Sequence, residues 1–96
     1  MYRIKKYTLD QAQKLGVQVK PSRSAGKKID VYKNGLFIVS IGAIDYNDFP
    51  TYLEREKQGK EPKGTAEQRR KLYKIRHAKD RAVKNSAGYY ADKLLW

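Results

Sequence analysis

The chain of 96 residues carries 22 lysine and arginine residues against 10 aspartate and glutamate residues, a formal net charge of +12. This length favours one compact domain over residues 1–96, and a hydrophobic content of 40% is typical of a globular protein. The sequence has no cysteine and one histidine, which excludes disulfides, thiolate zinc sites and multi-histidine metal centres within one chain. The longest apolar run, residues 36–44, is too short to span a bilayer, so we expect no membrane partner.

The N-terminal quarter of the chain predicts one short helix. Thr8 can cap its start, and Gly16 can end it. A small apolar stripe lies between these two residues and consists of Leu9, Ala12 and Leu15. The alternation of side chains in residues 2–7 favours an edge strand before the helix, and a loop rich in small and basic residues begins at Pro21.

A β-hairpin is the clearest structural signal in the sequence. Asn34-Gly35 is a preferred two-residue turn, because both positions tolerate a positive φ. Residues 29–33 alternate before the turn, and residues 36–41 are β-branched and apolar after it. Because the second strand is apolar on both faces, we expect it to lie between two layers or inside the sheet. Residues 17–19 predict a third strand.

Three helices are expected after the hairpin. Asp48 can cap the first, which should extend to about residue 57. Thr65 and Gln68 match a capping box at the start of a long helix over residues 66–83. Ser86 can cap a last short helix. The sequence therefore predicts an α+β fold: a small antiparallel sheet built on the hairpin, one N-terminal helix and about three C-terminal helices.

The long helix has an unusual distribution of charge. On a helical projection, one side carries the apolar residues Leu72, Ile75, Ala82 and Val83. The other side carries a broad cationic crescent formed by Arg69, Arg70, Tyr73, Lys74, Arg76, His77, Arg81 and Lys84. Only one acid, Asp80, lies between Arg69 and Lys84, so repulsion among the cations favours an anionic partner. The pattern predicts contact with nucleic-acid phosphates, and a merely solvated face is the alternative.

Several residues outside this charge pattern extend the hypothesis. Lys27 and Lys28 are expected to assist phosphate binding. Tyr73 and His77 are spaced to stack on bases, although Tyr73 can equally flank the core and His77 can be an ordinary exposed residue. The C-terminal aromatic residues Tyr89, Tyr90 and Trp96 are expected to close the core or to form a stacking platform. Trp96 can alternatively anchor a contact with a partner protein.

A metal-dependent nuclease is a further alternative. The carboxylates of Asp45, Asp48 and Glu54 could hold a divalent cation, although capping explains Asp48 and a helix surface explains Glu54. Residues 30–32 and 40–42 faintly resemble a GIY-YIG nuclease, in which Arg69, Arg70 or Arg76 would be the helix arginine. The opening glycine, the second tyrosine and the spacing of that motif are absent. We therefore assign no catalytic residue, metal site or cofactor and expect a protein that is not an enzyme.

Three segments together resemble a known group of proteins: residues 41–52 (IGAIDYNDFPTY), 69–81 and 86–96 (SAGYYADKLLW). The group consists of small basic proteins of unknown function encoded by large DNA viruses of algae and other protists. The resemblance spans residues 27–96 best and carries no established activity, so no functional residue transfers. It implies a location in the virion or in the interior of an infected host cell, nucleus or cytoplasm. The leading expectation is therefore a viral protein that binds DNA or RNA, and the alternative is a minor structural virion component that docks on an acidic capsid protein.

Overall fold

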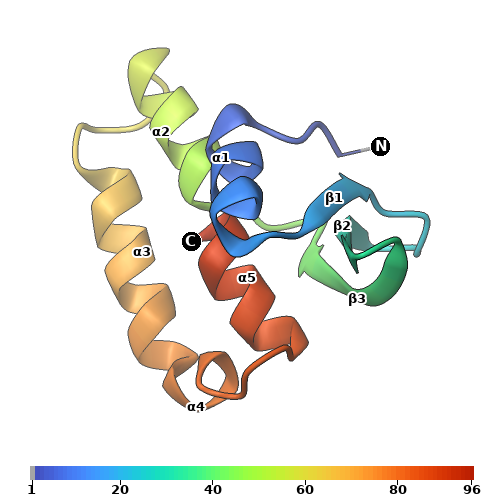
Figure 1. Ribbon diagram of the computed structural model, residues 1–96. Helices are drawn as coiled ribbons and strands as arrows, with labels where there is room; N and C mark the ends of the chain where they lie inside the picture. Colours follow the sequence, from blue (N-terminus) through green and yellow to red (C-terminus); the bar gives the residue numbers. More distant parts are fainter. Residues whose placement is uncertain (1) are drawn as a thin grey trace.

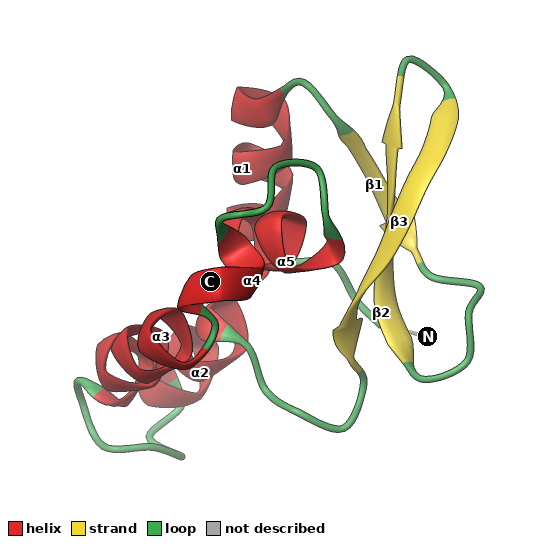
Figure 2. Cartoon of the chain, turned by 90° about the horizontal axis from the view of Figure 1, so that it is seen from below, coloured by secondary structure: helices red, strands yellow, loops and turns green. Residues whose placement is uncertain are grey.

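The computed structural model describes residues 2–96, which form an α+β fold with a three-stranded antiparallel sheet and five helices (Figure 1). In chain order the elements are α1 (Lys6–Leu15), β1 (Gln18–Pro21), β2 (Lys27–Lys33), β3 (Leu36–Ala43), α2 (Phe49–Lys57), α3 (Thr65–Arg76), α4 (Ala78–Arg81) and α5 (Ala87–Leu95). Figure 2 shows the sheet as one layer with the helices on one side of it. This architecture confirms the fold class expected from the sequence. None of the described helices is long and apolar enough to cross a membrane.

The sheet is built around the predicted hairpin. Asn34 and Gly35 have φ angles of 53° and 79°, so both turn residues adopt the left-handed conformation that this pair tolerates. The strand order is β1-β2-β3, and the expected third strand pairs with β2. A register shift at Val31/Tyr32 marks a bulge between β2 and β3. The hairpin prediction and the third strand are both confirmed.

The position of β3 differs from the expectation. It is an edge strand, not a strand inside the sheet, because among the described elements only β2 pairs with it. Leu36 and Phe37 are 72% and 56% exposed, whereas Ile41 is 1% exposed. The exposed pair directly follows the Asn34-Gly35 turn, at the start of β3. An apolar run on both faces of a strand therefore does not by itself require two covering layers.

Helix α5 forms the centre of the hydrophobic core. Its residues Tyr90, Leu94 and Leu95 are at most 2% exposed and belong to the same cluster as the sheet residues Ile29 and Val31. The Tyr90 hydroxyl keeps a partner, since it donates to Asn85 Oδ1 at 2.9 Å. The aromatic C-terminal segment thus closes the core, as one of the two sequence interpretations proposed.

The N-terminal segment was predicted incorrectly in two respects. Residues 2–5 form no strand, and α1 begins at Lys6, two residues before the expected cap. Thr8 lies inside the helix, fully buried, and its Oγ1 donates to the Leu94 carbonyl at 2.8 Å. The hydroxyl therefore ties α1 to α5 and does not cap α1. The predicted end is confirmed, since Gly16 takes a left-handed conformation with φ 73°.

Of the three helix caps expected after the hairpin, two are confirmed and one is wrong. Asp48 accepts a hydrogen bond from the Thr51 amide at 3.0 Å, and Ser86 Oγ accepts from the Tyr89 amide at 3.2 Å. The expected capping box at the start of α3 is wrong, because α3 begins at Thr65 itself. Glu56 of α2 caps it instead, accepting from the amides of Gly64 at 2.9 Å and Ala66 at 2.6 Å. These backbone hydrogen bonds lower the pKa of Glu56 below its ordinary value.

The long helix expected over residues 66–83 is interrupted. His77, with φ −105° and ψ 24°, separates α3 from the single-turn α4. The interruption redirects the chain so that α4 packs against α5, and Gly88 of α5 lies where an added Cβ would be 2.7 Å from Asp80. The cations of the predicted crescent therefore do not lie along one continuous helical face.

Candidate nucleic-acid interface

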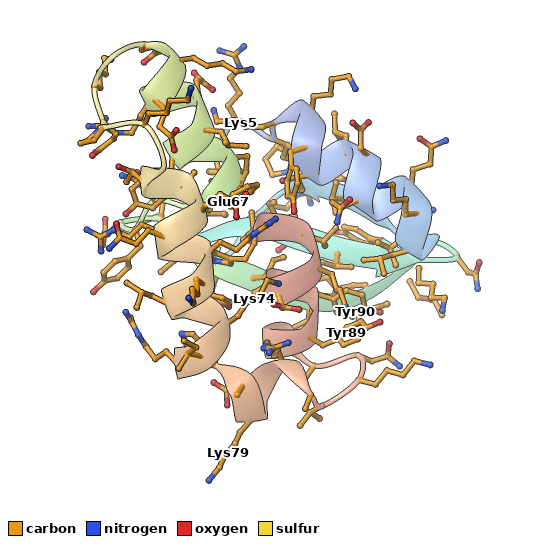
Figure 3. The ribbon with its side chains drawn as sticks, turned by 90° about the vertical axis from the view of Figure 1, so that its left-hand side faces the viewer. Lys5, Glu67, Lys74, Lys79, Tyr89 and Tyr90 are labelled. Carbon is orange, nitrogen blue, oxygen red and sulfur yellow. The ribbon has the colours of Figure 1, made fainter. Side chains whose placement is uncertain are left out.

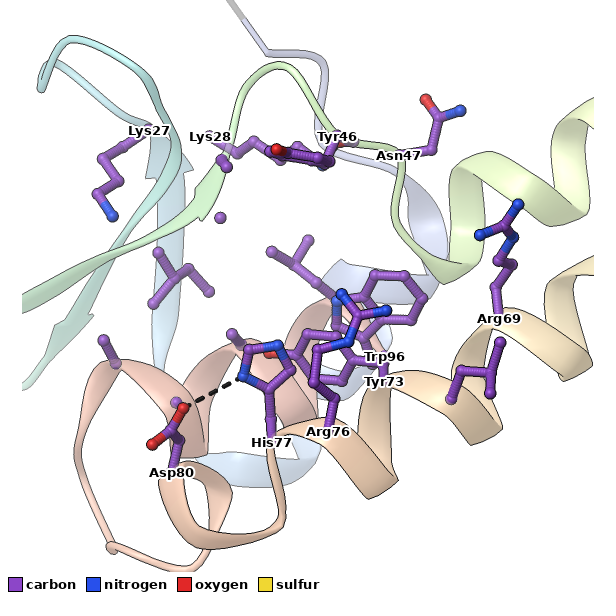
Figure 4. Close-up of a pocket in the computed structure, with 18 of the residues that line it drawn as sticks. Lys27, Lys28, Tyr46, Asn47, Arg69, Tyr73, Arg76, His77, Asp80 and Trp96 are labelled. Atoms are coloured by element: carbon purple, nitrogen blue, oxygen red, sulfur yellow. Dashed lines mark hydrogen bonds and ion pairs between the residues drawn. The ribbon is translucent and has the colours of Figure 1, made fainter.

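A cleft of about 490 Å³ lies between the sheet and α3, with α5 forming its floor. One wall is the second half of β3 together with the following loop, and the other wall is α3 (Figure 4). Three small residues of α5 line this floor and leave the space above it open: Ala87, Gly88 and Ala91. A concave site of this volume is large enough for a small organic ligand.

An ion pair buried beside the cleft ties β2 to the loop between β3 and α2. Lys28 Nζ lies 2.9 Å from Asp48 Oδ2, and the two side chains are 4% and 1% exposed. Lys28 also donates to the Tyr46 carbonyl, and the Tyr2 hydroxyl donates to Asp48 Oδ2 at 2.6 Å. Burial by itself raises the pKa of Asp48, but hydrogen bonds from Thr51 and Tyr2 and the charge of Lys28 outweigh it, so this pKa lies below its ordinary value.

This arrangement changes the interpretation of two predicted residues. Lys28 was expected to contact phosphate, yet its ammonium group is enclosed and already paired. Asp48 was a candidate metal ligand, and here it caps α2 and neutralises Lys28. Glu54, another candidate, pairs with Lys5 at 3.0 Å. Within residues 2–96 no group of three or more histidine, cysteine, aspartate or glutamate residues is placed to hold a metal ion.

An aromatic stack lines the α3 side of the cleft. The rings of Tyr73 and Trp96 are 4.4 Å apart and inclined by 8°, and those of Tyr73 and His77 are 4.3 Å apart and inclined by 27°. Figure 4 shows the imidazole and the indole on either side of the Tyr73 ring. Burial, followed by the charge of Asp92, raises the pKa of Tyr73. Trp96 is thus stacked within the fold, and its expected contact with a partner protein stays a prediction.

Three cations surround the opening of the cleft: Lys27 from β2, and Arg69 and Arg76 from α3 (Figure 4). Arg69 lies over the ring of Tyr52, with 5.8 Å between the guanidinium carbon and the ring centroid. None of the three forms an ion pair with an acid of the described chain. Asp80 is the one acidic residue lining the cleft within residues 2–96, and its Oδ2 lies 3.2 Å from His77 Nδ1.

The remaining cations of the predicted crescent face another way. Arg70 lies over the ring of Phe49 at 4.3 Å and pairs with Glu67 at 3.1 Å. Lys74 reaches toward α5 (Figure 3) and pairs at 2.8 Å with Asp92, which is 2% exposed. The other two predicted residues are Arg81, which donates to the carbonyl of Lys74 at 3.1 Å, and Lys84, which is exposed outside the cleft. The cations of the predicted crescent therefore form two groups. Arg69 and Arg76 line the cleft, whereas Arg70, Lys74 and Arg81 make contacts within the fold.

The predicted apolar stripe of the long helix is wrong. Leu72, Ile75 and Val83 are 46%, 66% and 59% exposed. The inward positions are instead Ala66, which is fully buried, and the half-buried Arg70, Tyr73 and Lys74. The reason is chemical: Asp92 is buried on α5 and needs a cation, so α3 turns Lys74 toward it and Ile75 away.

The sequence interpretation missed part of the cleft. Tyr46, Asn47 and Tyr52 line it, and local patterns gave no reason to place them opposite α3. Comparisons with models of protein families, with curated proteins and with solved structures found no match to this chain. The resemblance to small proteins of large DNA viruses accordingly stays a prediction.

Proposed function

We propose that this protein binds nucleic acid without catalysing a reaction on it, through phosphate contacts around the cleft. The observation that carries the proposal is the convergence of Lys27, Arg69 and Arg76 from two distant parts of the chain onto one concave site. Among residues 2–96 these cations have no acidic partner, so they are available to pair with an anionic ligand. A net charge of +12 adds a long-range attraction for any polyanion.

Binding would be driven mainly by release of the counterions condensed on the nucleic acid. The three cleft cations, together with exposed lysines outside the cleft such as Lys71 and Lys79, give a footprint of several phosphates. If about six phosphates are neutralised, the affinity falls roughly a thousandfold between 50 and 200 mM salt. Since phosphates are the same at every position, no strong sequence preference is expected.

The test is a fluorescence anisotropy titration of labelled DNA and RNA oligonucleotides at several salt concentrations. Replacing Lys27, Arg69 and Arg76 together by alanine should reduce the salt slope by about 3, because each phosphate contact contributes about 1. The matched control replaces three exposed lysines that do not line the cleft: Lys14, Lys33 and Lys57. Equal losses in the two triple variants would show that net charge alone is responsible and would contradict the proposed site.

The acidic-protein alternative uses the same cations and is supported by one separate feature. The exposed apolar residues Leu36 and Phe37 of β3 offer a surface suited to a protein partner rather than to phosphate. Competition with polyglutamate separates the two functions. Displacement of bound labelled DNA by polyglutamate at a lower charge concentration than by unlabelled DNA would favour an acidic protein. Magnesium-stimulated shortening of the oligonucleotide in the same assay would instead support the nuclease alternative.

A further inference from the structure

We infer that the cleft accepts an unpaired nucleobase, so that the protein prefers single-stranded nucleic acid over a duplex. The inference rests on the proposed function and adds to it the form of nucleic acid that the site selects. It depends on the aromatic lining of the cleft rather than on its charge.

The shape of the cleft suits a base. Phosphate contacts need no cavity, whereas this cleft has a volume of about 490 Å³, enough for a small organic ligand. The floor is apolar, formed in part by Ala91 and Leu95, and Tyr46 lies across the opening from the Tyr73–Trp96 stack (Figure 4). A flat aromatic ligand can lie between these walls. A base inside a duplex is stacked and paired on both sides and cannot enter unless it is extruded.

The stack limits where such a base can lie. Because His77 and Trp96 cover the two faces of Tyr73, a ligand reaches the stack only at its outer ends. The planar guanidinium groups of Arg69 and Arg76 border the same space and can either stack on a base or bind its phosphate. The carboxylate of Asp80 disfavours phosphate near His77. The phosphate therefore belongs toward Arg69, and the base belongs over the apolar floor.

The chain contains a built-in reporter of this event. Trp96 is its single tryptophan and lines the cleft. Insertion of a base beside the indole should quench its fluorescence, while phosphate contact outside the cleft should not. We expect oligo(dT) to quench the fluorescence of Trp96 in step with the anisotropy change. We also expect it to bind about tenfold more tightly than a duplex of equal charge, because one stacked base contributes a free energy of that size.

A variant that fills the cleft tests the geometry without changing the charge. Ala87 is exposed at the start of α5 and lines the cleft, so Ala87→Phe should block the base while the helix still forms. Ala78→Phe, at an exposed alanine of α4 outside the cleft, is the matched control. We expect Ala87→Phe to lose the quenching and about tenfold of the affinity for oligo(dT). The loss of duplex affinity should be much smaller, because the three cations at the opening stay in place, and Ala78→Phe should behave as the unmodified protein. Circular dichroism verifies that both variants fold.

The outcomes separate this inference from the proposed function. No binding of either oligonucleotide at low salt would refute both. Equal affinity for single strand and duplex, with no change in Trp96 fluorescence, would refute the inference and leave phosphate binding intact. A loss of duplex affinity in Ala87→Phe as large as the loss for oligo(dT) would also overturn it, because the cleft would then be a phosphate site only.

Discussion

Lys74 and Arg76 lie two positions apart on α3, and both carry a positive charge, yet the structure uses them differently. Lys74 pairs with the buried carboxylate of Asp92, whereas Arg76 lines the cleft without an acidic partner in the described chain. Lys27 and Lys28 repeat the contrast on β2: Lys27 is exposed at the cleft, and Lys28 is buried against Asp48. Adjacent cations in this protein therefore divide between those paired with a buried acid and those left available for the proposed ligand, and the partner across the fold decides which.

The contrast on β2 should give the largest effect. Lys28→Met leaves the carboxylate of Asp48 buried without its cation, so we expect the free energy of unfolding to fall by about 3 to 5 kcal/mol. Lys27→Met removes only an exposed charge and should change the same quantity by less than about 0.5 kcal/mol. Urea unfolding followed by circular dichroism measures both. Similar stabilities for the two variants would show that the buried pair does not stabilise the fold.

The contrast on α3 should be smaller and should appear in two measurements. Lys74→Met leaves Asp92 without its main partner and should lower the free energy of unfolding by about 2 kcal/mol, less than for Lys28 because the Lys74 side chain is 35% exposed. Arg76→Met should leave stability within about 0.5 kcal/mol and reduce the salt slope of nucleic-acid binding by about 1. Urea unfolding and anisotropy titrations of the two variants test the division. The proposed difference between these two cations is wrong if Arg76→Met destabilises the protein more than Lys74→Met does.

The same buried pair predicts a smaller effect of pH. Burial raises the pKa of Asp48, but hydrogen bonds from Thr51 and Tyr2 and the charge of Lys28 together outweigh it, so the pKa in the folded protein lies below its ordinary value of 3.8. Protons therefore bind the unfolded state more readily, so this stabilisation is complete above pH 3.8 and is lost as the pH falls through the lower folded value.

The measurement is the urea midpoint between pH 2 and 6 for the unmodified protein and for Asp48→Asn. The variant should lose less stability than the unmodified protein as the pH falls. Part of its remaining pH dependence is due to Asp30, whose pKa is also lowered in the folded protein. Burial raises the pKa of Asp30, but hydrogen bonds from Ser22 and Ser40 outweigh that effect. Asp10→Asn, at an exposed carboxylate, is the control. If the urea midpoint of Asp48→Asn falls with pH as steeply as that of the unmodified protein, ionised Asp48 does not stabilise the fold.

Where the sequence predicted the structure correctly, a few adjacent residues were sufficient. The Asn34-Gly35 turn, the end of α1 at Gly16 and the caps at Asp48 and Ser86 each depend on backbone conformations and hydrogen bonds within about four residues. The caps expected from Thr8 and Thr65 were wrong because distant groups competed for the same role. The carbonyl of Leu94 takes the Thr8 hydroxyl, and Glu56 supplies the cap of α3.

The sequence by itself determined the α+β class, the hairpin and the excess of positive charge, because these depend on composition and on short-range preferences. Only the tertiary structure decided which face of α3 turns inward, which cations stay available for a ligand, and that a cleft forms above the small residues of α5. The physical reason is that a buried carboxylate must find polar partners wherever the fold brings them near. Asp48 and Asp92 find lysines 20 and 18 positions away, and Asp30 finds the hydroxyls of Ser22 and Ser40.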